Sequence, residues 1–268
     1  MEYDPIKRKL GVWFNSKPFL RKLFYKLLDV LLLRTWHIKK EIKLWGKLSP
    51  GEKTILDAGS GFGQYSYYLS SNNKDWNITG IDVKEEQTRD CNAFFSRINR
   101  TGVHFETADL TVFRRENAFD LIISVDVMEH ILEDRAVFSN FHHSLKEKGV
   151  LLISTPSDLG GSDAHDHEEG SFIGEHVRNG YSVADISEKL SGAGFKDISV
   201  RYTYGKPGSL SWRLSMKYPI LMLNASKIFI VFLPFYYLLV FPFCLILNFL
   251  DVSMVQKTGT GLIVKAVK

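Results

Sequence analysis

The stretch "LDAGSGFG" at residues 56–63 places an acid and three glycines where an apolar run meets a helical one. These residues are Asp57, Gly59, Gly61 and Gly63. Glycines in a strand-to-helix turn let the backbone bend sharply and approach a ligand closely, while the following helix presents its N-terminal amides. Asp82 ends the next apolar run, nineteen residues after Gly63, where an acid can accept hydrogen bonds from ribose hydroxyls. Together these residues predict a site for a nucleoside-containing ligand.

The glycine spacing argues against a dinucleotide. The fingerprint G-x-G-x-x-G needs a glycine at position 64, where this chain has Gln64. The observed pattern is D-x-G-x-G-x-G. The glycine-rich stretch of this chain therefore does not match the dinucleotide fingerprint.

Candidate catalytic groups follow two later apolar runs. Glu129 and His130 come just after "FDLIISV", and either could act as a general acid or base. The segment "SDAHDHEEGSFIGEHVR" follows the next run and brings His176 and Arg178 as further candidates. Its ligand-type residues have no regular spacing, so a solvated loop without a metal is the favoured interpretation over a metal site formed by His165, Asp166, His167, Glu168 and His176.

The elements that must position these residues alternate between two kinds. Helices are expected between the strands, and such alternation predicts an α/β fold with a doubly wound parallel sheet. Ligands of these sheets bind outside the carboxyl ends of the strands, where the candidate residues lie. The expected strands are 54–58, 77–82, 103–107, 119–125, 149–155 and 197–204, and the expected helices lie near 62–71, 85–99, 132–146 and 182–192.

Five motifs in order resemble those of the class I S-adenosylmethionine (SAM)-dependent methyltransferases. "LDAGSGFG" resembles the first motif of the family, and Asp82 in "GIDV" its ribose-binding acid. "TADL" places Asp109 where the family contacts the adenine amino group, with Leu110 packed nearby. "FDLIISVDVMEHI" and "LKEKGVLLISTP" resemble the fourth and fifth strands. The resemblance implies a Rossmann-like seven-stranded sheet whose antiparallel last strand is "GLIVKAV", and SAM as the cofactor, held by Asp57, Gly59, Gly61, Gly63, Asp82, Asp109 and Leu110.

The chemistry implied by this resemblance needs little covalent help from the protein. The methyl group on a sulfonium is already activated, so holding a nucleophile in line with it does most of the work. A general base assists when the nucleophile must lose a proton. The side chains expected to act are Glu129, His130 and His176.

Charge is unevenly distributed along the chain. The net charge is +4, yet residues 1–53 carry thirteen Lys and Arg against five Asp and Glu. An amphipathic helix is expected from about Pro18 to Trp45, and with Trp13 and Trp36 nearby it suits anionic lipid headgroups. The alternative is a helix that packs on the sheet and leaves its basic face in water.

The stretch from Ile228 to Leu250 contains twenty-three residues without a charge, long enough to cross a bilayer as a helix. A single crossing conflicts with the expected sheet, because the strands before and after the stretch pair with each other. Pro234 and Pro242 are expected to break or kink a long helix, which favours a hairpin that dips into one leaflet. A hydrophobic cap over the active site and a dimer interface remain alternatives.

These observations predict an enzyme that methylates an apolar, lipid or lipid-linked acceptor from the cytoplasmic side, bound peripherally or monotopically to the inner membrane face. The alternatives are a soluble small-molecule O- or N-methyltransferase and a non-catalytic binding module. The "N/D-P-P-Y/F" tetrapeptide of base-methylating enzymes is missing after the fourth strand, so no nucleic-acid partner is expected, and the oligomeric state stays open. Four regions are expected: a basic helical region at 1–53, a SAM-binding core at 54–204, a hydrophobic insertion at 205–259 and the last strand at 260–268.

Overall fold

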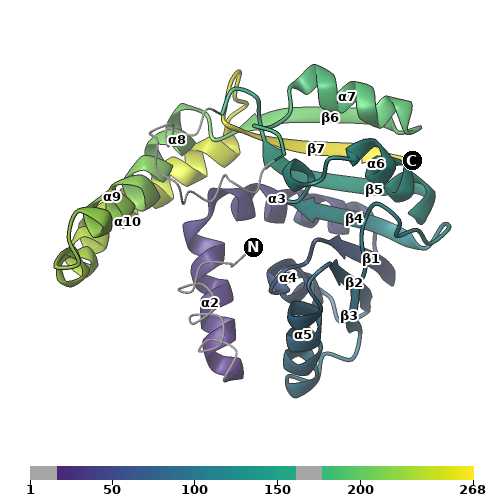
Figure 1. Ribbon diagram of the computed structural model, residues 1–268, viewed down its shortest axis with the longest axis horizontal. Coiled ribbons are helices and arrows are strands. Elements are labelled where there is room, and N and C mark those ends of the chain that lie inside the picture. Colours follow the sequence, from purple (N-terminus) through teal and green to yellow (C-terminus); the bar gives the residue numbers. More distant parts are fainter. Residues whose placement is uncertain (1–16, 161–176) are drawn as a thin grey trace.

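The structure, a computed structural model, describes residues 17–160 and 177–268 of the chain. Its centre is one seven-stranded sheet in the order β3-β2-β1-β4-β5-β7-β6, parallel except for β7, which is antiparallel to both of its neighbours (Figure 1). The predicted fold class is therefore confirmed, including the antiparallel last strand. The strands are β1 (Lys53–Ala58), β2 (Trp76–Asp82), β3 (Val103–Thr107), β4 (Phe119–Val125), β5 (Leu145–Pro156), β6 (Lys196–Thr203) and β7 (Gly261–Val267).

Helices cover both faces of the sheet because alternate strand residues point to opposite sides. In β1, Leu56 joins a core formed with α6 (Asp134–Ser144) and α7 (Val183–Gly192). Its neighbour Ile55 joins the opposite core. That second core is built with α2 (Pro18–Leu31), α3 (Leu33–Leu48), α4 (Gln64–Asn72) and α5 (Glu85–Arg97).

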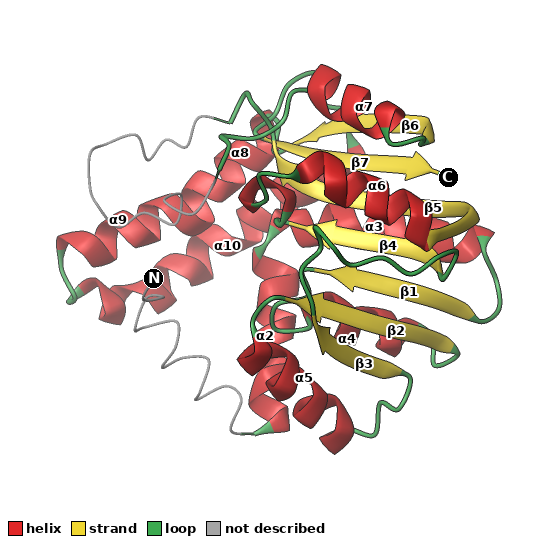
Figure 2. Cartoon of the chain, turned by 45° about the vertical axis from the view of Figure 1, so that its right-hand side comes forward, coloured by secondary structure: helices red, strands yellow, loops and turns green. Residues whose placement is uncertain are grey.

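The N-terminal region contains two helices, so the prediction of one continuous helix is wrong. The chain is extended at Leu32, with φ −93° and ψ 110°, and this residue separates α2 from α3. The helix α3 packs on the sheet through Ile38, Ile42 and Trp45, all of them buried. The break lets α2 leave the sheet and lie beyond the carboxyl ends of the strands (Figure 2).

The predicted hydrophobic insertion is present between β6 and β7 as a helical hairpin, residues 206–253. Its first arm is helical throughout and combines α8 (Lys206–Trp212), a π-helical turn η2 (Arg213–Lys217) and α9 (Tyr218–Ala225). The second arm, α10 (Phe229–Ser253), runs back beside it, and the hairpin projects away from the sheet (Figures 1 and 2).

Two prolines lie inside α10 without ending it. The expected interruption at Pro234 and Pro242 does not occur, since the helix continues for 25 residues. Each proline lacks an N–H, so it leaves one carbonyl of the preceding turn without its helical partner. The hydroxyls of Tyr236 and Tyr237 help hold this part of α10, donating at 2.8 Å to the carbonyls of Leu214 and Ser215 in the first arm.

A buried polar cluster fixes the base of the hairpin. The carboxylate of Asp251 lies 2.9 Å from Nε2 of His37 in α3, and both side chains are buried. The same carboxylate accepts hydrogen bonds from the backbone N–H groups of Tyr204 at 3.2 Å and Gly208 at 3.1 Å. The hairpin is thus attached to the N-terminal region as well as to the sheet.

Candidate functional site

The glycine-rich turn, residues 59–63, connects β1 to α4 at the carboxyl edge of the sheet. Gly59 has φ +78°, and a Cβ on it would come within 2.3 Å of a Val127 methyl group, so a larger residue does not fit. Gly61 also has a positive φ of +49°, but a Cβ there would meet no atom within 4 Å. The turn therefore combines a close contact with the protein at Gly59 and open space at Gly61.

Asp57 supports this turn from within the protein. Its buried carboxylate accepts hydrogen bonds from the N–H of Ser66 at 3.0 Å and from the Ser66 hydroxyl at 2.6 Å. Burial raises the pKa of Asp57 to about 6, against the lowering effect of the Ser66 hydrogen bonds. In this structure Asp57 therefore holds the start of α4 beside the glycine-rich turn.

Asp82 and Asp109 stand at or just beyond the ends of the next two strands. Asp82 accepts hydrogen bonds from the N–H groups of Gly61 at 3.0 Å and Lys84 at 2.9 Å. Asp109 accepts from the N–H and hydroxyl of Thr111, each at 2.8 Å, while Leu110 is buried in the core. Because β1, β2 and β3 are adjacent and parallel, all the predicted cofactor residues gather along one edge.

These residues fit SAM. The open space at Gly61 gives a ligand access to the backbone, and Asp82 and Asp109 offer carboxylates to hydroxyl and amino groups farther along the edge. Asp57 and Gly63 would support the glycine-rich turn rather than contact the ligand, since Asp57 is buried and Gly63 precedes α4 in a left-handed conformation.

Beside the cofactor edge lies a second polar cluster, which sequence reasoning mostly missed. Arg34 of α3 forms an ion pair with Asp126, which follows β4 in a left-handed conformation with φ +53°. The backbone N–H of Arg34 donates a hydrogen bond to the Tyr204 hydroxyl at 3.1 Å, and Tyr65 of α4 contributes a further buried hydroxyl. Burial lowers the pKa of Arg34, but Asp126 and then the two tyrosines outweigh it and raise the pKa overall. Asp126, within "SVDVMEH", and Tyr65, two residues after Gly63, lie close in the sequence to predicted site residues, whereas Arg34 and Tyr204 do not.

Glu129 faces into this cluster, whereas His130 does not. Glu129 is 1% exposed and accepts a hydrogen bond from the Thr155 hydroxyl at 3.1 Å. Burial, followed by repulsion from Asp126, raises the pKa of Glu129 to about 8. A carboxyl group with this pKa can take or release a proton near neutral pH. His130 ends the same short turn, η1 (Met128–His130), and is exposed.

The loop after β5 is described only in part. His176 and the other predicted metal-type residues of this loop lie outside the described residues. Arg178 is described, and its guanidinium forms an ion pair with Asp134 and donates to the Ile131 carbonyl at 2.5 Å. Lys189 also binds Asp134, at 2.9 Å. Arg178 thus stabilises the loop around α6 in this structure. Among the described residues no group of His, Cys, Asp or Glu is suited to hold a metal ion.

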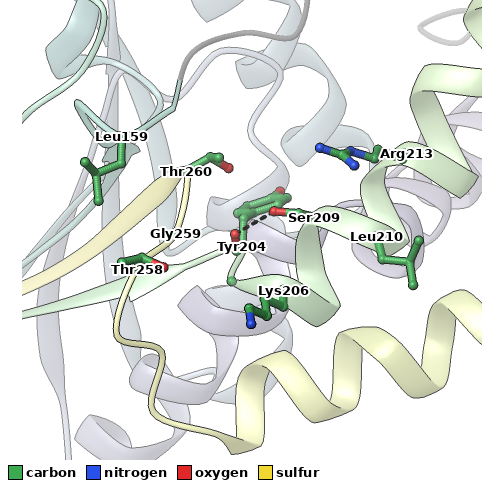
Figure 3. A pocket seen from close by; sticks show the side chains of 10 residues that line it. Leu159, Tyr204, Lys206, Ser209, Leu210, Arg213, Thr258, Gly259 and Thr260 are labelled. Carbon is green, nitrogen blue, oxygen red and sulfur yellow. Dashed lines mark hydrogen bonds between the residues drawn. The ribbon is translucent and has the colours of Figure 1, made fainter.

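A cavity of about 340 Å³ lies at the base of the hairpin (Figure 3). Tyr204 connects the cavity to the polar cluster, because its hydroxyl joins Arg34 and its ring lines the cavity. Lys206 and Arg213 bring positive charge to the cavity wall, and Leu210 brings an apolar surface. The cavity therefore suits a ligand with an anionic group and an apolar part.

Comparison with known proteins agrees with this geometry. A family described as a methyltransferase domain matches residues 50–190, more than half of the chain. The chain belongs to the class I SAM-dependent methyltransferases. Its cofactor is SAM, as the predicted motifs implied. The matched residues include the glycine-rich turn, Asp82, Asp109 and Glu129, but exclude α2 and the hairpin.

Several relatives of this methyltransferase carry the same kind of name. A phosphoethanolamine N-methyltransferase of Triticum aestivum is 34% identical over 153 residues, which are 56% of this chain and 29% of the relative. Phosphoethanolamine N-methyltransferase 1 of Arabidopsis thaliana is 32% identical over 161 residues, 56% of this chain and 30% of that protein. The chain thus matches less than a third of the length of these relatives.

Solved structures share the fold at low identity. Haemonchus contortus phosphoethanolamine N-methyltransferase 2, in complex with phosphomonomethylethanolamine and S-adenosylhomocysteine, superimposes with a TM-score of 0.57 and 18% identity. The match covers 90% of this chain and 59% of that chain. The [4+2]-cyclase SpnF gives the same TM-score at 17% identity, covering 88% and 81%. The fold alone therefore does not identify the acceptor.

Proposed function

We propose that this methyltransferase transfers the methyl group of SAM to an apolar, lipid or lipid-linked acceptor at the cytosolic membrane face. The surface of α10 carries the proposal. Of the described helices, α10 is the one long and apolar enough to cross a bilayer, and only 6% of its most apolar window is buried. A core helix of a soluble domain would be mostly buried, so this surface needs a partner other than water.

The free energy available from this surface is large. Placing half of each exposed side chain of α10 in lipid would contribute roughly 1 kcal/mol per residue, and about 10 kcal/mol in total. These side chains are Ile230, Val231, Phe232, Phe235, Leu238, Leu239, Phe243, Ile246, Phe249 and Leu250.

The topology of the hairpin favours monotopic insertion over a single crossing. Thr203 at the end of β6 pairs with Gly261 at the start of β7, so both ends of the hairpin lie on the same side of any membrane. The tip between the arms, residues 226–228, carries Lys227, whose transfer to the bilayer centre would be costly. A shallow orientation, with α10 in the lipid and Lys227 near the headgroups, avoids this cost.

The same arrangement supplies a route for the acceptor. The cavity at the hairpin base has Lys206 and Arg213 for an anionic group, and beyond it the apolar hairpin can accompany a chain into the bilayer. The cavity wall formed by Tyr204 leads to the cluster of Arg34, Asp126 and Glu129. An acceptor bound here would reach the cofactor edge from the membrane side.

In this mechanism SAM supplies an electrophilic methyl group, and the chain supplies position and a proton acceptor. The ion pair of Arg34 and Asp126 holds the wall beside the cofactor edge. Glu129, with its pKa raised to about 8, takes the proton that the acceptor nitrogen or oxygen loses. His130 lies on the same turn but is exposed and does not face this cluster, so Glu129 is the base that we propose.

A soluble phosphorylated amine is the second candidate acceptor. The observation that favours it is the shared name of the relatives, phosphoethanolamine N-methyltransferase. Lys206 and Arg213 would serve a free phosphate as well as a lipid phosphate. In that case the hairpin would be a lid or a contact between two copies.

The test is a transfer assay with methyl-tritiated SAM. The purified protein is incubated with host membranes and cytosol, and the label is partitioned into organic, aqueous and protein fractions. Label in the organic phase, lost in Asp82→Ala, is the expected result, because Asp82 lies at the cofactor edge. Label in the aqueous phase alone would refute the apolar acceptor and support the second candidate.

Membrane attachment of the hairpin is tested separately by flotation with neutral phosphatidylcholine vesicles. Replacing Leu238 and Leu239 by lysine should release the protein, because both side chains are more than 70% exposed on α10. Leu48→Lys is the matched control, since Leu48 is 80% exposed at the end of α3 and lies outside the hairpin. Equal flotation of all variants would refute insertion of the hairpin.

A further inference from the structure

The helix α2 packs on the protein through one side and exposes large apolar side chains on the other. Its buried residues are Arg21 and Tyr25, which are 2% and 1% exposed. Its exposed side carries an outer stripe of four large apolar residues spaced i, i+4, i+8 and i+11, which share one helix face. These are Phe19, Leu23, Leu27 and Val30, which are 72%, 40%, 46% and 40% exposed.

Positive charge flanks this stripe. At 100° per residue, Lys22 and Lys26 fall along one side of the outer stripe. Apolar residues bordered by lysines are the pattern of helices that lie in the surface of an anionic bilayer. Pairing with a second copy would bring like charges together, so charge complementarity favours lipid. In both views α2 and the hairpin lie beyond the carboxyl ends of the parallel strands (Figures 1 and 2).

The inner side of α2 holds the glycine-rich turn. Arg21 donates from Nη2 to the Phe62 carbonyl at 2.8 Å, and the Tyr25 hydroxyl donates to the same carbonyl. Asp29 accepts a hydrogen bond from the side chain of Gln64 at 2.9 Å. Phe62 lies between two of the cofactor-site glycines, and Gln64 begins α4. Any change in how firmly α2 is held therefore reaches the SAM site directly.

In water α2 is held by these hydrogen bonds and by the packing of Phe24 and Tyr25, while its outer stripe faces the solvent. A helix of 14 residues is marginal by itself, so a further contact can change how firmly α2 is held. Lipid contact with the outer stripe would favour the helical, docked state in which Arg21 and Tyr25 reach Phe62. The cofactor turn is preorganised in that same state, so lipid binding and SAM binding favour one conformation.

We infer that α2 couples the membrane to the cofactor: an anionic bilayer surface binds the outer stripe and raises the affinity of the enzyme for SAM. This coupling goes beyond the proposed function, because it concerns SAM binding and needs no acceptor. Coupling between two binding sites is reciprocal, so SAM must raise the affinity for vesicles by the same factor. A factor of about 5 to 150 corresponds to the usual size of such couplings.

The experiment measures SAM binding to the full chain by equilibrium dialysis, without acceptor. Three conditions are compared: no vesicles, phosphatidylcholine vesicles, and phosphatidylcholine vesicles containing phosphatidylglycerol. The expected result is tighter SAM binding only with the anionic vesicles, and tighter vesicle binding in the presence of SAM. An affinity unchanged by vesicles, or raised equally by neutral ones, would overturn the inference.

Variants separate the outer stripe from the inner contacts. Leu23→Glu and Leu27→Glu should bind SAM normally in solution but lose the response to vesicles, whereas the control Leu48→Glu should keep it. Tyr25→Phe should still bind vesicles but respond less, because it lacks the hydroxyl that reaches Phe62. Circular dichroism verifies that each variant is folded. A full response in Leu23→Glu would overturn the inference.

The outcome is distinguishable from that of the proposed function. If anionic vesicles raise the SAM affinity but the transfer assay labels no organic-phase product, the result supports the coupling and refutes the lipid acceptor. If a lipid product forms while the SAM affinity is unchanged by the bilayer, the result supports the lipid acceptor and refutes the coupling. A stripe-dependent dimer in solution, seen by size-exclusion chromatography, would assign the outer stripe to a second copy and refute the lipid partner.

Discussion

Replacing Asp251 by alanine tests whether the hairpin is a fixed part of the enzyme. The carboxylate of Asp251 accepts three hydrogen bonds, from His37, from the Tyr204 N–H and from the Gly208 N–H, at 2.9, 3.2 and 3.1 Å. Asp251 is 0% exposed, and His37 is 2% exposed, so water does not readily replace the lost acceptor. Removing one partner of such a buried cluster costs about 3–5 kcal/mol, because the remaining donors stay buried without partners.

The free energy of unfolding, measured with urea in detergent and followed by tryptophan fluorescence, should fall by that amount in Asp251→Ala. Asp185→Ala is the matched control: Asp185 is 42% exposed and pairs with Lys189 on its own helix, so its loss should cost about 0.5 kcal/mol or less. Asp251→Ala should also raise the acceptor KM, since Tyr204 lines the cavity, and leave the SAM Kd unchanged. A loss below about 1 kcal/mol with an unchanged KM would refute the reasoning, since it would mean that the cluster neither stabilises the hairpin nor positions Tyr204.

Four further predictions concern the site. Burial raises the pKa of Glu129 from 4.5 to about 8. The contribution of Glu129 to the free energy of unfolding should therefore be complete below pH 4.5 and decline as the pH rises toward 8. Thermal unfolding of Glu129→Gln across this range should show a flatter pH dependence than that of the wild type. The same variant should lose about 100-fold or more in kcat with little change in SAM affinity, and an unchanged kcat would exclude Glu129 as the base. Gly59→Ala should weaken SAM binding at least tenfold, because its Cβ would meet Val127 at 2.3 Å. Gly61→Ala should keep the fold and lose affinity for SAM only through backbone strain and contact with the ligand. Isothermal titration distinguishes the two variants, and equal, intact SAM affinities would contradict this geometry. Asp82→Asn should weaken SAM binding without unfolding the protein, as measured by titration and circular dichroism together, because the amide keeps one acceptor for Gly61 but presents the wrong group to ribose hydroxyls.

The cofactor half of the site was predictable because its residues are local. The turn after β1 and the acids that follow β2 and β3 each lie within a few residues of a strand end. The order of the strands then brings these ends together, so motif spacing was enough to infer the cofactor edge. The helical insertion was equally visible, since an uncharged run of this length is a compositional signal.

The acceptor half could not be predicted in the same way. Arg34 and Asp126 are 92 residues apart, and Tyr204 joins them from the other end of the sheet. Nothing in the local sequence of α3 indicates which of its basic residues meets Asp126. Packing of α3 on the sheet decides this, because Ile38 and Ile42 fix the rotation of the helix.

The amino-acid sequence by itself therefore determined the class of fold and the presence of an apolar hairpin, because strand periodicity and uncharged runs are properties of neighbouring residues. The cofactor followed from the resemblance of the sequence motifs to those of a known family. Only the tertiary structure decided that α2 turns Arg21 and Tyr25 inward and its apolar stripe outward, and that His37 meets Asp251. A helix with apolar residues on several sides has no preferred face until the elements around it are placed. The partner that each surface receives is set by those elements, through the burial and hydrogen bonds that the whole fold makes available.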